Sequence, residues 1–584
     1  MGMSQTPEPA PANPADAPLP SGESARKRPS MLRSVVSFSS MTMISRVFGL
    51  LRDMVLSRVF GVSAATDAFW VAFRIPNFMR RLFAEGSFTT AFVPVFTEIK
   101  EKRSHADLKA LVSRTAGSLG AVLVVIVGLG IVFAPQVATV FSPGAIENPE
   151  KFELTVKLLR LTFPFILFVS MTALAGGALN SFHRFGMPAL VPVLLNLSMI
   201  GCALWLTPML GPRPHPPLLD TRIVVLGWAI AFGGVIQLLC LLPQMAKLDL
   251  LAWPRLGFGH PDVRKVMRLM VPTLFGSSIA QVNLLLDTVI ASLLYVGSQS
   301  WLSQADRFLE LPLGVFGIAL GTVILPTLAR HHVNTDRDGF SKSLDWGLRT
   351  TLMIAVPAML GLMFLSVPLV ATLFQYGNYT PFDTQMAALS VFGLSFGLPA
   401  FALVKVVLPA FYARQDTRTP VKAGVASLVA NMFFNFLFLG VLWFAVIRHL
   451  WVPAGAPDLT AAIAAAQSSS LFTAFSKLPG LHFALGMASA VASYLNLMLL
   501  WRWLRKAGVY QRQPGWTQFL LRLGAACAVM VGMLLVGLHW GPDFTAVSAM
   551  RRILWLGGLT VAGVIAYGAA MFAMGFRLRE LHGH

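Results

Sequence analysis

Apolar segments about as long as a bilayer is thick recur along the whole chain, with short polar connections between them. A helix needs roughly 20 mostly apolar residues to cross the hydrocarbon core. We read about fourteen such segments, at residues 34–60, 66–97, 111–141, 154–181, 187–208, 223–246, 266–294, 301–329, 347–375, 384–412, 420–446, 481–504, 516–540 and 551–576. The alternating segments of about ten residues that build a membrane β-barrel are absent from the sequence. The pattern therefore predicts an all-α polytopic membrane protein.

The composition agrees with this class. Of the 584 residues, 55% are hydrophobic and only 12% are charged, and the mean hydropathy is +0.67. A soluble protein carries about a quarter charged residues. The net charge of +20 would suit a nucleic-acid-binding protein, but the basic residues lie mostly in short loops between apolar segments. That distribution is typical of a membrane protein and not of a basic face for nucleic acid.

The basic loops predict the orientation of the chain. They alternate with connections at 61–65, 295–300 and 376–383 that contain neither Lys nor Arg. Basic loops stay in the cytoplasm, and an even number of spans then leaves both termini there. Residues 1–30 are rich in Pro and Ala and resemble a disordered tail more than a signal peptide. The basic residues that fall on the outside against this rule are Arg213, Arg222, Arg448, Lys477, Arg551 and Arg552.

A weak internal repeat relates each span to the one six further on. N-S-F-H-R-F-G-M-P at 180–188 follows span four, and F-Y-A-R-Q-D-T-R-T-P at 411–420 follows span ten. Transporters are often built from such repeats, with the substrate between them. We predict a first lobe at 31–247 and a second at 248–506, the latter with a long outer connection at 447–480. Residues 507–584 would add spans thirteen and fourteen and a C-terminal tail.

The first two predicted spans carry charged residues where lipid is expected. A charge at that depth costs several kcal/mol unless it faces a partner or a water-filled cavity. Asp67, Arg74 and Arg81 are seven residues apart, which places them on one stripe of a helix. The full set in these two spans is Arg46, Arg52, Asp53, Asp67, Arg74, Arg80, Arg81 and Glu85. These two spans are therefore expected to line a water-filled cavity.

Spans eight and ten add charges from the other repeat. They are Asp306, Arg307, Glu310 and Lys405. Buried ion pairs that fix helix packing would explain part of this set. The basic residues outnumber the acids, however, and a surplus of arginines in a low-dielectric cavity attracts an anion, above all a phosphate, which the planar guanidinium binds with two hydrogen bonds. The substrate-binding set would be Arg46, Arg52, Arg74, Arg80, Arg81, Arg307 and Lys405. The acids Asp53, Asp67, Glu85, Asp306 and Glu310 would pair with the arginines in one state of the protein and release them in another.

A second polar group lies on spans seven and eleven. Asn283 and Asp287 are one helical turn apart, and so are Asn431 and Asn435. One carboxylate with amide oxygens could hold Na⁺, whereas asparagines in a membrane bundle also bond helices to one another. Both readings remain open for Asp287, Asn431 and Asn435 at this point.

Enzymatic functions find little support in the sequence. Cys202, Cys240 and Cys527 lie inside apolar segments without metal-ligand spacing. The sequence contains no P-loop and no HExxH motif. We expect a transporter without ATP hydrolysis, driven by an ion gradient, the membrane potential or the substrate gradient.

Several motifs resemble the lipid II flippase family MurJ (MviN), which is part of the multidrug/oligosaccharidyl-lipid/polysaccharide exporter superfamily. The motifs are S-S-M-T-M-I-S-R-V-F-G-L-L-R-D (39–53), A-T-D-A-F-W-V-A-F (65–73), P-N-F-M-R-R-L-F-A-E-G-S-F-T-T-A-F-V-P (76–94), A-D-R-F-L-E-L-P (305–312), L-F-Q-Y-G (373–377), F-Y-A-R-Q-D-T-R-T-P (411–420) and Q-P-G-W (513–516). The Pro-rich tail and the 447–480 connection depart from shorter members of the family.

This resemblance implies two six-helix lobes around a central cavity, with two extra helices that form a groove for the polyprenyl tail. It implies that the essential cavity arginines of the family match Arg46, Arg52, Arg80 and Arg307, and that an essential acid matches Asp67. It also raises Na⁺ as a coupling ion at Asp287, Asn431 and Asn435, with no other cofactor.

The expected function is flipping of lipid II, the undecaprenyl-diphosphate-linked peptidoglycan precursor, across the bacterial cytoplasmic membrane by alternating access. Cell-wall synthesis proteins are possible partners. The alternatives are an exporter of another lipid-linked oligosaccharide and a non-transporting scaffold for the cell-wall machinery.

Overall fold

The computed structural model describes residues 31–81, 88–214, 219–314, 318–334, 336–453 and 458–576, without the side chains of 31–42, 88–90, 271–280, 318–323 and 471–472. These residues form helices joined by short connections, and this part of the chain contains no β-strand. The predicted all-α membrane class is confirmed. Ten helical segments of the described chain are long and apolar enough to cross a membrane.

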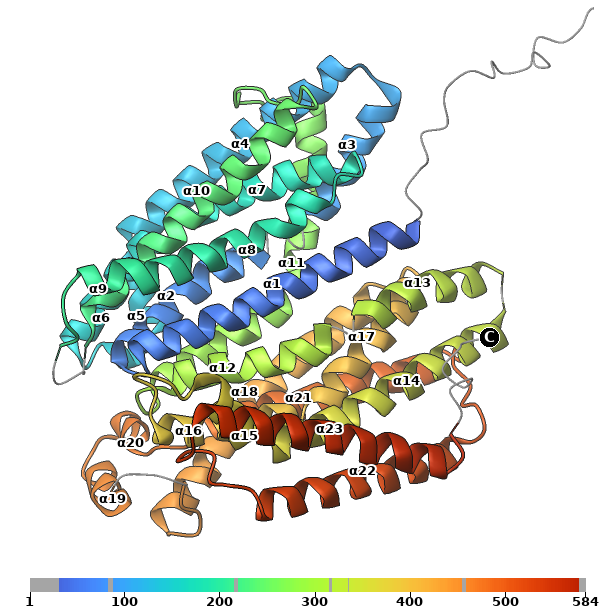
Figure 1. Cartoon of the computed structure of the whole chain (residues 1–584). Coiled ribbons are helices and arrows are strands. Elements are labelled where there is room, and N and C mark those ends of the chain that lie inside the picture. Colours follow the sequence, from blue (N-terminus) through green and yellow to red (C-terminus); the bar gives the residue numbers. More distant parts are fainter. Residues whose placement is uncertain are drawn as a thin grey trace, which may run out of the picture.

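The first half of the chain forms a bundle in the upper part of Figure 1. Its helices are α1 (Met31–Phe60), α2 (Ala64–Arg80), α3 (Phe88–Lys102), α4 (His105–Val132), α5 (Ala134–Phe141), α6 (Pro149–Thr162), α7 (Pro164–Ser181), α8 (Gly186–Gly201), α9 (Thr207–Met209) and α10 (Val224–Ala246). Their buried faces share one apolar core, in which large side chains such as Phe69, Phe92 and Phe165 are fully enclosed.

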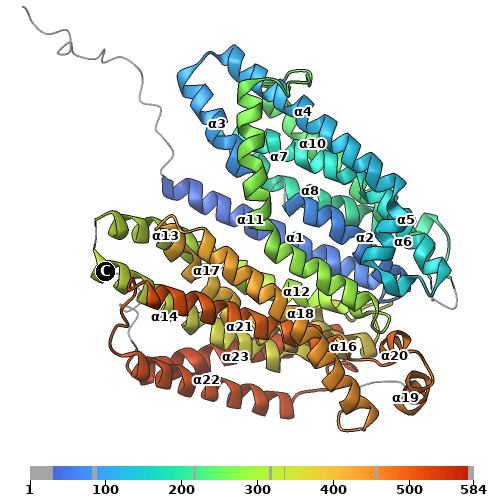
Figure 2. The same cartoon turned by 180° about the vertical axis from the view of Figure 1, so that it is seen from behind.

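The second half forms a bundle below the first in the same view. Its helices are α11 (Pro261–Ser292), α12 (Ser298–Pro312), α13 (Ile318–Val333), α14 (Arg337–Phe364), α15 (Ser366–Phe374), α16 (Pro381–Ser395), α17 (Leu398–Tyr412), α18 (Arg418–Ile447), α19 (Leu459–Gln467), α20 (Leu471–Lys477) and α21 (Phe483–Lys506). Helix α11 runs from one bundle to the other, as Figure 2 shows. Its first turns contribute Val266 and Met270 to the core of the first half, and its last turns pack in the second.

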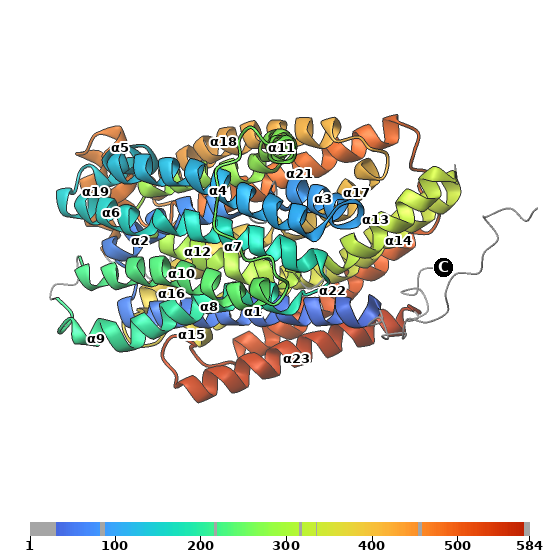
Figure 3. The same cartoon turned by 90° about the horizontal axis from the view of Figure 1, so that it is seen from above.

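Two further helices, α22 (Trp516–His539) and α23 (Ala549–Ala573), lie along the flank of the second half. They pack against each other and against α14 and α15. Figure 3 shows α23 at the edge of the molecule. Their outward side chains, such as Leu521, Val564 and Phe572, are exposed, as expected of surfaces that face lipid.

Each predicted span matches one helix or consecutive helices, and the span at 187–208 also contains a π-helical turn, Cys202–Leu206, between α8 and α9. The predicted span at 154–181 breaks between α6 and α7, where Pro164 begins the second helix, and the span at 384–412 breaks just before Pro399 of α17. Proline lacks an amide N–H and fits the first turn of a helix, so a break in front of it costs little. The 447–480 connection is partly helical. Helices α19 and α20 pack Ile463, Ala466 and Ala474 over α11, α18 and α21.

Candidate functional site

Arg52 of α1 is the most buried of the predicted cavity arginines, at 3% exposure. Its Nε and Nη2 donate to Asp53 Oδ1 at 2.8 and 2.6 Å, and its Nη1 donates to Asn196 Oδ1 at 3.1 Å. The guanidinium carbon lies 6.0 and 5.7 Å from the ring centres of Trp70 and Phe73 on α2, close enough for cation–π attraction. Arg52 is therefore fixed within the first half.

Asp53 extends this contact into the second half. Its other carboxylate oxygen accepts from Arg307 Nε of α12 at 2.6 Å. Arg307 Nη1 donates to Glu310 Oε2 at 2.9 Å, and the other oxygen of Glu310 accepts from Arg81 Nη2 at 3.3 Å. Five side chains thus form one chain of alternating charge, with its members on α1, α12 and the end of α2. We call this set, Arg52–Asp53–Arg307–Glu310–Arg81, the central charge chain.

Arg46 and Arg74 lie beside the central charge chain. Arg46 donates to the backbone carbonyl of Glu310. Arg74 donates to Thr288 Oγ1 of α11 at 3.0 Å and to Ser303 Oγ of α12 at 3.2 Å. It also lies 3.5 Å from a carboxylate oxygen of Asp306. Both arginines of the first half therefore reach the second half.

The charges around this set do not balance. Arg46, Arg52, Arg74, Arg81 and Arg307 face four acids, which are Asp53, Asp306, Glu310 and, near Arg74, Asp287. Several of these groups keep contact with solvent although they lie at mid-span. The side-chain exposure is 29% for Arg81, 36% for Glu310 and 40% for Asp306. An excess of guanidinium groups with open hydrogen-bonding positions can accept an anion.

Three other residues predicted to line the cavity lie outside the central charge chain. Lys405 of α17 is exposed, and no ion pair to it is seen in the described residues. Arg80 donates to Asn77 Oδ1 on its own helix at 3.0 Å. Glu85 lies outside the described residues.

Asp67 bonds to the start of a helix and not to an arginine in this structure. It accepts from Gly297 N at 2.7 Å, from Ser300 N at 3.2 Å and from Ser300 Oγ at 2.9 Å. The amino end of α12 carries a partial positive charge and free N–H groups that attract a carboxylate. Asp67 thereby joins α2 to α12 at the end of the bundle opposite Arg81.

The polar residues predicted on spans seven and eleven also lie in contact with one another. Asp287 Oδ1 accepts from the side-chain amides of Asn431 and Asn435 at 2.9 and 2.8 Å. Its Oδ2 accepts from Asn283 at 3.4 Å and from Ser489 Oγ at 3.2 Å. The Oδ1 atoms of Asn431 and Asn435 are buried and have no hydrogen-bond partner among the described residues. The group therefore holds two unsatisfied amide oxygens beside a carboxylate.

The sequence reading missed Asn196 and Ser489. Each is a polar residue within an apolar span, and Asn196 is 7% exposed. A buried polar side chain needs a hydrogen-bonding partner. That requirement could have marked Asn196 as a partner of a charged residue, but it could not have identified Arg52.

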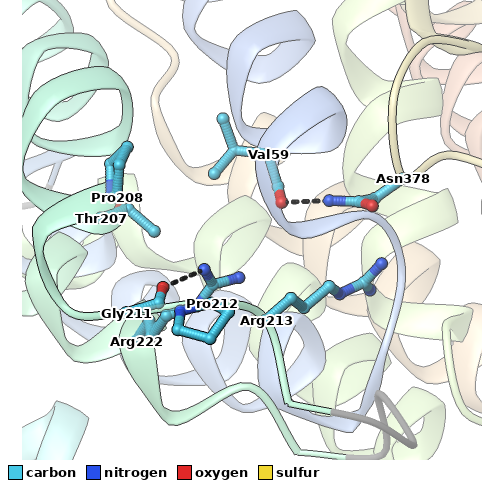
Figure 4. Close-up of a pocket in the computed structure, with 8 residues that line it drawn as sticks. All are labelled: Val59, Thr207, Pro208, Gly211, Pro212, Arg213, Arg222 and Asn378. Carbon is cyan, nitrogen blue, oxygen red and sulfur yellow. Dashed lines mark hydrogen bonds between the residues drawn. The ribbon is translucent and has the colours of Figure 1, made fainter.

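The end of the bundle that carries Gly61, here called the Gly61 end, is closed by contacts between the halves. Asn378, in the turn between α15 and α16, donates its side-chain amide to Val59 O at 2.6 Å and its backbone N–H to Arg58 O at 3.1 Å. From the other side, Arg213 Nη2 donates to Phe60 O at 3.1 Å. The carbonyls at the carboxyl end of α1 are thus bound by both halves. Figure 4 shows Asn378 and Arg213 on either side of this helix end, beside a cavity of about 610 Å³.

Two glycines permit this close approach. A Cβ on Gly61 would lie 2.5 Å from Asn378 O, and one on Gly377 would lie 2.5 Å from Arg58 O. Both have positive φ, at +67° and +62°, a conformation that glycine adopts without strain.

Contacts between the halves end at the level of the central charge chain. From the Gly61 end inward they include Ser57 with Gln304, Asp53 with Arg307, and Arg46 and Arg81 with Glu310. Apart from the contacts of α11 and the segment before it, no hydrogen bond between the halves beyond Glu310 is seen in the described side chains. The described contacts therefore close the bundle at one end only.

Comparison with known proteins identifies the family. Residues 56–448 match the family model described as "Lipid II flippase MurJ". The chain is 38% identical over 558 residues to the "Probable lipid II flippase MurJ" of Vibrio cholerae, covering 94% of this chain and 97% of that protein. It is 36% identical to the "Lipid II flippase MurJ" of Burkholderia cenocepacia, covering 94% and 98%.

Solved structures agree on the fold. A structure titled "Lipid II flippase MurJ, inward closed conformation" superposes with a TM-score of 0.71 at 23% identity, covering 92% of this chain and 98% of that one. An inward-facing multidrug transporter of the MATE family and the MOP superfamily superposes with a TM-score of 0.58 at 11% identity, covering 81% and 98%. With the family model over most of the chain and relatives of this similarity over nearly all of it, the chain belongs to the lipid II flippase MurJ family.

Proposed function

We propose that this protein flips lipid II from the inner to the outer leaflet of the bacterial cytoplasmic membrane by alternating access. Membership of the family supports the substrate. The observation that carries the mechanism is the central charge chain, which holds a surplus of partly exposed arginines at mid-span, between the two halves. A lipid-linked diphosphate is an anion that must pass this level.

The diphosphate would bind by replacing carboxylates. Arg307 and Arg81 both bond to Glu310, and phosphate oxygens can take over these bonds because guanidinium groups bind phosphate and carboxylate in the same way. Loss of the bonds from Arg307 to Asp53 and from Arg81 to Glu310 would remove two of the ion pairs that join α12 to the first half. Substrate binding would thus loosen the contact that closes the bundle.

The Gly61 end is the outer face in this proposal, because its connections at 61–65, 295–300 and 376–383 lack basic residues. Both termini are then cytoplasmic, and the structure corresponds to a state closed toward the outside. The cycle uses no ATP hydrolysis.

Na⁺ is proposed as a coupling ion at Asp287. The residues fit a small cation, because Asn431 and Asn435 each have a buried amide oxygen next to a carboxylate, with no partner in the part of the chain that the structure describes. Oxygen ligands of this kind suit hard cations. The ion would supply a positive charge to Asp287, and the asparagines would turn their oxygens toward it.

Loss of the central charge chain should stop transport. Arg307→Ala is expected to abolish the appearance of lipid II in the outer leaflet of proteoliposomes and to fail in a cell depleted of its own flippase. Arg505→Ala, at an exposed position at the end of α21, is the control and should behave like the unchanged protein. Transport by Arg307→Ala at the normal rate would refute the mechanism. Export of another lipid-linked saccharide, or complementation without transport, would instead support an exporter or a scaffold.

Binding of Na⁺ should be visible without transport. The unchanged protein should melt at a higher temperature in NaCl than in KCl of equal ionic strength, because a ligand that binds only the folded state stabilises it. Asp287→Asn should remove this difference. An equal melting temperature in both salts for the unchanged protein would exclude the site while leaving the flippase proposal intact.

A further inference from the structure

A second cavity, of about 330 Å³, lies in the first half, away from the central charge chain. It is bounded by α4, α7, α10 and the segment that leads to α11 and opens to the surface, and all its lining residues are apolar or glycine: Ala116, Gly117, Gly120, Ala121, Leu167, Phe168, Met171, Leu238, Pro254 and Leu256. Nothing in the proposed transport cycle uses this cavity.

The segment before α11 lies against α4 without forming a helix of its own. Ser113 Oγ donates to Trp253 O at 2.5 Å, and Arg255 N donates to Ser113 O at 3.0 Å. A Cβ on Gly117 would lie 2.2 Å from Arg255 O, so this contact requires glycine. The segment is thereby held at one edge of the cavity.

Large apolar side chains of this segment point outward. Trp253 is 88% exposed and Leu256 is 70% exposed. An aqueous surface would make this exposure costly, whereas Trp is favoured at the boundary between lipid head groups and acyl chains. The segment therefore lies at the bilayer boundary, with the apolar cavity beside it.

Two arginines are close neighbours in the chain of residues that line the cavity, and the side chain of Arg114 lies against Gly257 of the segment before α11. Arg114 lies one turn before Gly117 on α4, and Arg255 stands between the lining residues Pro254 and Leu256. Neither arginine has an ion pair within the described residues. Three acids at this end are occupied by other bases, in the pairs Glu98–Lys265, Asp249–Lys109 and Asp262–Arg103. The hydrogen bond and charge of Lys109 also lower the pKa of Asp249, so that acid stays ionised in its own pair.

We propose that this cavity binds an anionic phospholipid of the surrounding bilayer. One acyl chain fills the apolar space between α4, α7 and α10, and the phosphate bonds to Arg114 and Arg255. Charge complementarity favours an anionic head group over a zwitterionic one, because each basic residue near the membrane surface contributes about 1 kcal/mol. The lipid would hold the segment before α11, and so the start of the helix that joins the two halves. The site is independent of the proposed transport function.

The test is a titration of the purified full-length protein by native mass spectrometry, with phosphatidylglycerol and phosphatidylcholine of the same acyl chains. The unchanged protein should retain a first phosphatidylglycerol more tightly than phosphatidylcholine. Arg255→Gln, in the exposed segment, should weaken this binding about fivefold, and Arg114→Gln with Arg255→Gln should remove the preference. Arg505→Gln should have no effect.

The cavity itself is tested with a pair of glycines on one helix. A Cβ on Gly120 meets only Met171 at 3.9 Å, and one on Gly128, also on α4, meets nothing within 4 Å. Gly120→Ile should fill the cavity and lower retention of both lipids, whereas Gly128→Ile should leave it unchanged. Equal retention by all variants, or retention of an isoprenoid diphosphate in place of phosphatidylglycerol, would overturn the proposal.

Discussion

Asp53 bridges two arginines with one carboxylate. One oxygen accepts from Arg52 and the other from Arg307, and the acid itself is 2% exposed. Buried ions gain little net stability from pairing, but removing one partner leaves the others uncompensated. The charge of Asp53 is therefore needed by both halves of the molecule.

Asp53→Asn should lower the free energy of unfolding by about 3 kcal/mol, because it leaves two guanidinium groups short of negative charge. Thermal or denaturant unfolding in detergent measures this. The control is Asp338→Asn, whose pair with Lys342 is mostly exposed at 66% and 64%, so its loss should change the free energy of unfolding much less. A similar decrease in the free energy of unfolding for the two variants would show that Asp53 stabilises the fold no more than an exposed ion pair does.

Sequence reasoning reached the residues of this site but not their partners. Spacing by seven placed Asp67, Arg74 and Arg81 on one stripe, yet in the structure these three bond to different groups: the start of α12, Asp306 and Glu310. Helical periodicity gives the direction of a side chain within its own helix. It contains no information about which residue of a distant helix stands opposite.

At the level of elements, the carboxyl end of α1 is the point where the two halves meet. Asn378 of the second half and Arg213 of the first half bind neighbouring carbonyls of the same helix end. The last carbonyls of a helix have no partners within it, so they are available for such bonds. Closure at the Gly61 end thus depends on backbone groups of α1 and on Asp67 at the start of α12.

Asn378→Ala should increase the share of molecules open at the Gly61 end. A cysteine at Val62, in a protein otherwise free of cysteine, should react faster with a membrane-impermeant maleimide when Asn378 is replaced. Asn148→Ala is the matched control, since Asn148 also caps a helix but bonds within its own half, to Lys151 N. Unchanged labelling of the Asn378 variant would show that other contacts close this end.

Across the whole molecule, the all-helical class and the positions of the long apolar helices could be predicted because bilayer thickness sets the length of apolar segments. The breaks within spans and the helices α19 and α20 could not be placed, because tertiary packing decides them. Two of the arginines that broke the positive-inside rule are explained by helix ends. Arg213 binds the end of α1, and buried Arg552 binds Ala371 O and Gln375 O at the end of α15, both at 3.0 Å.

Arg552 is expected to hold α22 and α23 to the second half. Arg552→Met keeps the length of the side chain but removes the hydrogen bonds that the guanidinium donates to four carbonyls, those of Ala371, Gln375, Thr545 and Val547. Hydrogen exchange should then speed up in residues 543–552 and 371–376. Its neighbour Arg551 is exposed, so Arg551→Met should leave exchange as it was. Equal exchange in both variants would mean that packing alone holds the two helices.

The two kinds of contact between the halves differ in what can replace them. At the Gly61 end the bonded groups are carbonyls, amides and one carboxylate near the boundary with water, and water can take over such bonds at small cost. The contact around Arg307 is instead held by full charges, including Asp53, which is 2% exposed, and a buried charged group left alone is expensive. Thermal motion alone would then often break the contacts at the Gly61 end but rarely those of the central charge chain. An empty carrier with this arrangement would seldom turn over, and the membrane would stay tight to ions until a lipid-linked diphosphate supplied the missing negative charge.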